Sequence, residues 1–222
     1  MKFKNFRNRL RERLDFCKIT PDGFRYLTED GKACLLGCQR STSAELPAYI
    51  EECPVVFLSG LGKSRLAGEI RIPDTVRELD DGVLRYQKYI TKIFIPETVE
   101  KIGDCAFCGC NAMEEIIFPD SLESLGEYTV QECTQLKKIH VPEHLTVIPF
   151  GFAEYCKTLE EIHIPETVKE IQPFAFYSCR NLKIVNFPAN LKLIGDCAFS
   201  ECENLRKSDI PDGCQVHPDA FD

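Results

Sequence analysis

The chain has 222 residues and a formal net charge of −8, from 27 Lys and Arg against 35 Asp and Glu. This acidic balance argues against a nucleic-acid-binding protein, because such a protein needs a basic surface for the phosphates. No apolar run approaches the roughly 20 residues that a membrane-spanning helix needs.

The first predicted element is a basic amphipathic helix over residues 1–22. Apolar side chains recur there at helical spacing, between Lys and Arg residues, at Phe3, Phe6, Leu10, Leu14 and Cys17. We expect this helix to cap one end of the core that follows. Attachment to an anionic membrane surface through residues 1–20 is the alternative.

The same segment bears on where the protein resides. It contains neither the apolar stretch nor the small-residue cleavage site of a secretion signal. If Met1 is the native start, we therefore expect a cytoplasmic protein. A cell-surface or secreted protein is the alternative, which requires that a leader has been removed.

Residues 23–68 are predicted to hold a β-hairpin and an irregular first coil. The stretch FRYLTEDGKACLLGC is typical of two strands joined by a tight turn at Asp30-Gly31. The next stretch, ELPAYIEECPVVFLSG, has the pattern of the later repeats in a longer, degenerate form.

An internal repeat fills residues 69–222. Prolines recur every 23 residues, at Pro73, Pro96, Pro119, Pro142, Pro165, Pro188 and Pro211. Apolar columns follow three, six and seventeen positions after each proline, as in Val99, Ile102 and Met113. A unit with one short strand cannot bury its own apolar face, so the units must stack into one core. The strands then form a parallel sheet in which equivalent residues lie about 4.8 Å apart.

The pattern L-x-x-I-x-I-P-x-x-V-x-x-I-G-x-x-A-F-x-x-C resembles the BspA-like, or Treponema-type, leucine-rich repeat. The best copies are IFIPETVEKIGDCAFCGCNAM and VNFPANLKLIGDCAFSECENL. The resemblance implies an α/β repeat solenoid, a right-handed stack of about seven 23-residue coils with a short parallel β-sheet. It also implies kinship with bacterial surface proteins linked to adhesion or host contact.

Five cysteines form a column of the repeat, one every 23 residues: Cys110, Cys133, Cys156, Cys179 and Cys202. We interpret them as structural, buried thiols that donate weakly to turn carbonyls. A line of equivalent residues diverges along the stack, whereas a zinc site needs four converging ligands. The odd total of thirteen cysteines also favours free thiols over a disulfide framework. A stray thiol or metal site stays open for five cysteines outside the column: Cys34, Cys38, Cys53, Cys105 and Cys108.

A second column lies at the outward-facing strand position: Arg71, Phe94, Ile117, His140, His163, Asn186 and Asp209. Apolar and aromatic side chains beside hydrogen-bonding ones are typical of a partner-binding surface. Coverage by the N-terminal segment, or by a second copy in a homodimer, is the alternative. Beside this column Glu and Lys alternate, and we expect opposite charges to pair across strands and to fix their register.

Catalysis has no support in the sequence. There is no Ser/His/Asp or Cys/His constellation and no glycine-rich phosphate loop. The pair His140 and His163 lacks a third ligand at recognisable spacing. Carboxylates follow most of the prolines, but without the oxygen-rich loop of a calcium site, and we expect them to accept free backbone N–H groups. No cofactor and no metal site are therefore predicted.

The sequence thus predicts a non-enzymatic repeat scaffold that binds an unknown protein or peptide on its strand face. Two alternatives stay open. One is a bacterial surface protein for adhesion or host contact. The other is a thiol- or metal-dependent protein that uses the cysteines outside the column.

Overall fold

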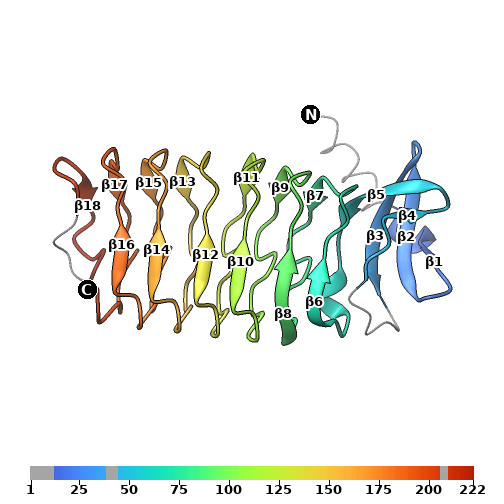
Figure 1. Ribbon diagram of the computed structural model, residues 1–222, viewed down its shortest axis with the longest axis horizontal. Helices are drawn as coiled ribbons and strands as arrows, with labels where there is room; N and C mark the ends of the chain where they lie inside the picture. Colours follow the sequence, from blue (N-terminus) through green and yellow to red (C-terminus); the bar gives the residue numbers. More distant parts are fainter. Residues whose placement is uncertain (1–12, 39–44, 206–209) are drawn as a thin grey trace.

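A computed structural model describes residues 13–38, 45–205 and 210–222. The chain forms an elongated stack of about eight turns with a hairpin at one end (Figure 1). Each regular coil presents a short strand on one side, a two-residue strand on a second side and a series of turns on the third. The predicted repeat solenoid with parallel strands is confirmed.

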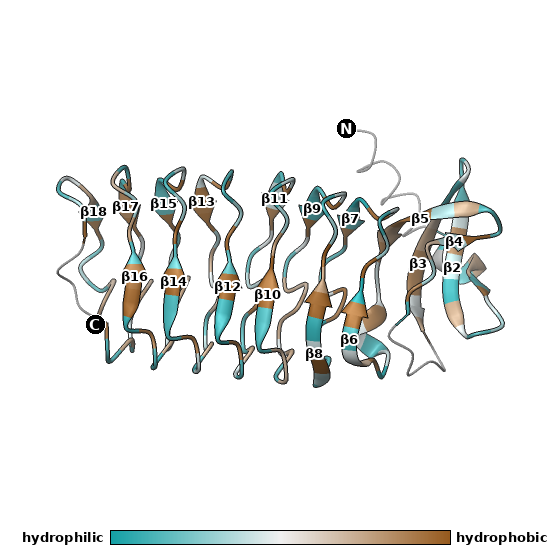
Figure 2. Ribbon diagram, in the orientation of Figure 1, coloured by the Kyte–Doolittle hydropathy of each residue, from teal (hydrophilic) through white to brown (hydrophobic). Residues whose placement is uncertain are grey.

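The first side of the stack is the strand face, which contains β6 (Ala67–Arg71), β8 (Tyr89–Phe94), β10 (Glu115–Ile117), β12 (Lys138–His140), β14 (Glu161–His163) and β16 (Ile184–Asn186). Residues 23 positions apart pair in parallel, as Ile93, Ile116 and Ile139 do, and their side chains are buried. The residues before and after them on each strand are partly or fully exposed. Figure 2 shows hydrophilic and hydrophobic segments next to each other on these strands.

The second side carries the shorter strands β7 (Glu78–Leu79), β9 (Lys101–Ile102), β11 (Ser124–Leu125), β13 (Val147–Ile148), β15 (Glu170–Ile171), β17 (Leu193–Ile194) and β18 (Gln215–Val216). The second residue of each of these strands from β7 to β17 packs into the core, as Ile102 and Ile171 do. This is the column six positions after the proline that the sequence marks as apolar.

The N-terminal end is a small sheet that merges with the second side. It contains β1 (Lys18–Ile19), β2 (Phe24–Glu29), β3 (Lys32–Cys38), β4 (Tyr49–Ile50) and β5 (Cys53–Leu58), with the short 3-10 helices η1 (Leu14–Phe16) and η2 (Leu61–Lys63). β2 and β3 are antiparallel and turn at Asp30 and Gly31, which both have positive φ. β5 pairs with β3 on one side and with β7 on the other, which joins the hairpin to the repeats.

The helix predicted over residues 1–22 needs correction in its described part. Residues 1–12 lie outside the described residues. Beyond η1 the chain is extended, because Lys18 and Ile19 pair with the edge of β2 and so satisfy their backbone hydrogen bonds there. The helical spacing of apolar residues therefore does not carry a helix as far as Cys17, whose sulfur instead accepts hydrogen bonds from Arg25 (3.0 and 3.2 Å).

The third side consists of turns, and the described residues contain no α-helix. Nine and thirteen positions after the proline, each of the coils from Pro73 to Pro188 has a residue with positive φ, such as Cys105 (54°) and Gly109 (71°). Two left-handed residues so close together break any helical run. The helical part of the expected α/β architecture is replaced by these turns.

Phenylalanine rings pack along the centre of the stack, from Phe107 through Phe118, Phe152 and Phe176 to Phe199, with neighbouring centroids 5.2–6.4 Å apart. Phe107, Phe176 and Phe199 share one repeat position. The two coils between Phe107 and Phe176 have Val130 and Ala153 at this position. Phe118 from the strand face lies between Phe107 and Phe152 instead.

Both strand ladders are interrupted at the coil that follows Pro142. β11 does not pair with β13, and β12 does not pair with β14, although all four strands are fully described. On the turn side the ladder continues, since the N–H of Val130 donates to the carbonyl of Phe152 (3.0 Å). Of the three backbone ladders, only the one on the turn side is therefore continuous at this level.

Pro149 accounts for part of this gap. One coil earlier, the N–H of Gly126 donates to Ile102 (2.9 Å), and Gln172 makes the same bond one coil later. Pro149 occupies the equivalent position but has no N–H, so the corresponding bond to Leu125 cannot form.

Candidate functional site

The strand register brings most of the predicted binding column into one line. Arg71, Phe94, Ile117 and His140 are successive partners on β6, β8, β10 and β12. His163 on β14 pairs with Asn186 on β16. Asp209, which was predicted to end the line, lies outside the described residues.

Two members of the line, Arg71 and Phe94, stack against each other. The guanidinium of Arg71 lies over the ring of Phe94, with its carbon 3.9 Å from the ring centroid. The ammonium of Lys92 approaches the same ring to 5.1 Å. Phe94 is therefore half-buried beneath two cations, and such contacts stabilise an aromatic side chain where it stands. The freely exposed apolar surface begins at the next strand.

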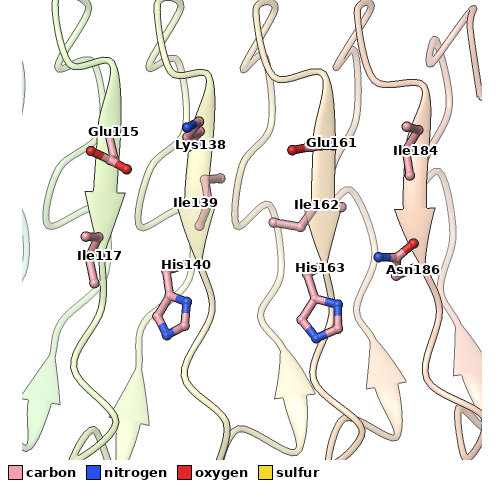
Figure 3. A pocket seen from close by; sticks show the side chains of 10 residues that line it. All are labelled: Glu115, Ile117, Lys138, Ile139, His140, Glu161, Ile162, His163, Ile184 and Asn186. Carbon is pink, nitrogen blue, oxygen red and sulfur yellow. The ribbon is translucent and has the colours of Figure 1, made fainter.

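A shallow groove of about 470 Å³ runs across the strand face from β10 to β16 (Figure 3). Ile117 and Ile184 lie at its two ends and are 50% and 53% exposed. Between them stand His140 and His163, and Asn186 lies beside Ile184. The groove thus combines two apolar contacts with hydrogen-bonding side chains.

Ile184 is a groove residue that the sequence analysis did not select. It occupies the column in which Glu115, Lys138 and Glu161 alternate in charge. The sequence did contain a sign of this role. An isoleucine in a column of otherwise charged, exposed residues does not increase solubility, so it indicates a contact surface. Only the register of β14 with β16 shows that it flanks the groove.

Opposite charges pair across strands, as predicted from their alternation. Lys92 lies 3.4 Å from Glu115, and Lys137 lies 3.0 Å from Glu114. These pairs are exposed, so each contributes at most about 1 kcal/mol to stability. His140 lies 4.0 Å from Asp120, a carboxylate that follows one of the prolines.

The carboxylates after the prolines serve the turns of the next coil. Asp120 accepts the N–H of Glu143 (3.1 Å), and Glu166 accepts the N–H of Ala189 (3.1 Å). These bonds satisfy backbone groups that the turns leave free, which was the expectation for this column.

The cysteine column is a ladder of thiol–carbonyl hydrogen bonds. Each thiol donates to a carbonyl of the preceding coil at 3.2–3.3 Å, and the donors are Cys110, Cys133, Cys156, Cys179 and Cys202. Burial raises the pKa of Cys110 and of Cys202 to about 12, and raises the pKa values of the other three well above the ordinary value. Such thiols are neutral at physiological pH, whereas metal ligands and nucleophiles act as thiolates.

The cysteines outside the column give little support to a thiol-dependent activity. All thirteen cysteines are free. Burial raises the pKa of Cys108 to about 11 and also raises the pKa values of Cys34 and Cys105, although the nearby Arg85 acts in the opposite direction on Cys105 and Cys108. Cys105 occupies the first left-handed turn position of its coil.

A cluster of potential metal ligands that the sequence analysis did not anticipate joins the last two coils. The Nδ1 atom of His217 lies 3.3 Å from Oδ1 of Asp196 and 3.9 Å from Oδ2 of Asp219. One ligand atom of each residue lies within 4.8 Å of the other two. His217 lies outside the column of His140 and His163, so only the stacking of the final coil reveals this neighbourhood.

A model of the BspA type leucine rich repeat region matches residues 63–152 and 147–222, with six copies of the repeat. The chain belongs to the BspA-type leucine-rich repeat family. No protein of curated function matches it. Among the described residues, no helix is long and apolar enough to cross a membrane.

Solved structures of leucine-rich repeat proteins share the fold. A leucine-rich repeat protein from Treponema pallidum is 25% identical, with a TM-score of 0.67, and the match covers 90% of this chain and 86% of that one. Leucine-rich repeat proteins from Bacteroides ovatus and Eubacterium ventriosum are 23% and 24% identical, with TM-scores of 0.66 and 0.65. The match covers 90% and 89% of this chain but 61% and 49% of those two, so it spans only part of their length.

Proposed function

We propose that this BspA-type repeat scaffold is non-enzymatic and holds an extended segment of another protein in its strand-face groove. The observation that carries the proposal is the pair of half-exposed isoleucines, Ile117 and Ile184, at the ends of a groove lined by His140, His163 and Asn186. Exposed apolar side chains next to hydrogen-bonding groups on a rigid sheet are the usual composition of a binding surface.

The charges of the groove favour an occupant with a matching pattern. Glu115, Lys138 and Glu161 alternate in charge from strand to strand along the groove. An extended segment of a different protein meets them in turn and can place a complementary charge against each.

Site-specific photo-crosslinking in cells that produce the protein natively tests this proposal. A photoreactive residue in place of His140 should capture a distinct protein, whereas the same residue in place of the exposed Lys157, outside the groove, should not. The adduct should disappear when Ile117→Asp and Ile184→Asp are added, provided that circular dichroism shows the variant folded.

Equal adducts from positions 140 and 157 would contradict the proposal. So would persistence of the adduct in the folded double variant. An adduct between two copies of this chain would replace the proposed partner with a homodimer.

A further inference from the structure

We propose that Asp196, His217 and Asp219 bind one divalent transition-metal ion of the zinc class, which fastens the last coil to the one before it. Asp196 belongs to the coil of Pro188, and His217 and Asp219 belong to the final coil. The site lies outside the groove, and it does not depend on the proposed partner.

The spacing of the three side chains fits a metal of this class. Zinc binds nitrogen and oxygen ligands at about 2.0–2.2 Å, so two ligands of a tetrahedral ion lie about 3.3–3.6 Å apart. The Nδ1 atom of His217 is 3.3 Å from Asp196 Oδ1 and 3.9 Å from Asp219 Oδ2. An imidazole with two carboxylates suits zinc, and water completes the coordination.

The contacts of Nδ1 in His217 leave two acceptors facing each other. The backbone N–H of Asp219 points at Nδ1 (3.3 Å), so a lone pair lies on that atom. The Oδ1 atom of Asp196 lies at the same distance from Nδ1 and also carries lone pairs. A bound cation between these two acceptors replaces their repulsion with two coordination bonds.

The backbone and a neighbouring thiol hold Asp196 and His217 in place. The N–H of His217 donates to the carbonyl of Ile194 (2.9 Å), which fixes the last coil in register. The thiol of Cys197 donates to Oδ1 of Asp196 (3.3 Å). Donors of this kind orient metal ligands in many sites.

Metal titrations of the full chain test the proposal, with Co²⁺ as the spectroscopic probe and Zn²⁺ as the calorimetric one. The wild type should bind one equivalent and melt at a higher temperature with the metal. Asp196→Asn and His217→Asn should each weaken binding at least tenfold and remove the rise in melting temperature. His144→Asn, which removes an exposed imidazole from a different coil, should bind like the wild type.

The free cysteines require a control for thiol ligation. The cobalt spectrum should show the weak bands of nitrogen and oxygen ligands, without intense charge transfer from thiolate. Should Asp196→Asn or His217→Asn fail to fold without metal, Asp219→Asn provides the same test at a side chain that is 62% exposed. No binding by the wild type, unchanged affinity in the folded variants, or a thiolate charge-transfer band would each overturn the proposal.

Discussion

Each sulfur of the cysteine column connects two coils at a single carbonyl oxygen. Val130 is one example: its oxygen accepts the N–H of Cys133 within the same turn (3.2 Å) and the thiol of Cys156 from the next coil (3.2 Å). The thiol therefore satisfies the second lone pair of a buried carbonyl while filling a space of its own size. Both roles explain why the position repeats.

Removing one such thiol tests this account. Cys156→Ala leaves a small cavity and an unused lone pair, so the free energy of unfolding should fall by about 1–2 kcal/mol. Cys156→Ser retains a donor and should lose less. Urea denaturation of both variants measures the difference, and equal losses would show that packing alone explains the column.

At the scale of elements, the interruption between β11 and β13 follows from a local exception to the repeat. β11 and β13 lack the bond that Gly126 and Gln172 make in their own coils, because Pro149 has no N–H. The gap between β12 and β14 has no comparable single residue behind it.

Replacing Pro149 tests whether the missing donor causes the first gap. In Pro149→Gln, which copies Gln172 of the next coil, the new N–H should donate to Leu125. We expect amide hydrogen exchange at residues 146–148 to slow at least tenfold relative to the wild type, with Gly126 as an internal reference. Unchanged exchange rates would assign the gap to the packing around Pro142 instead.

The strands and their register were predictable from the sequence because a period of 23 residues fixes which side chains stack. The core columns and the cysteine column follow from that period alone. The turns were not predicted in detail, since left-handed residues such as Cys105 and Tyr128 are not confined to glycine positions. The metal-ligand cluster was also missed, because it joins Asp196 to the shortened final coil, where the period no longer applies.

At the scale of the whole molecule, stability arises from contacts between neighbouring coils. Each coil buries its apolar columns against the next, so the stack behaves as a sum of similar units. The positions of Phe94 and Ile117 on one line of the strand face were predictable from the repeat. The burial of Phe94 beneath the guanidinium of Arg71 was not, because it depends on side-chain packing.

Deleting one whole coil tests this additive behaviour. Removal of residues 97–119 joins Pro96 to Asp120 and keeps the period, so the shortened chain should still unfold cooperatively. Removal of residues 97–108 breaks the period and places apolar columns on the wrong side, so it should abolish cooperative unfolding. Thermal melting followed by circular dichroism distinguishes the two, and similar curves for both would contradict the model of stacked units.

The break in the strand ladders has a mechanical consequence for the groove. Backbone hydrogen bonds resist bending of the stack on all three sides except at the coil after Pro142, where only the turn ladder is continuous. The groove spans this level, with His140 and His163 on opposite sides of the gap (Figure 3). The length of the groove along the stack is therefore held at this level by fewer backbone hydrogen bonds than between the other coils.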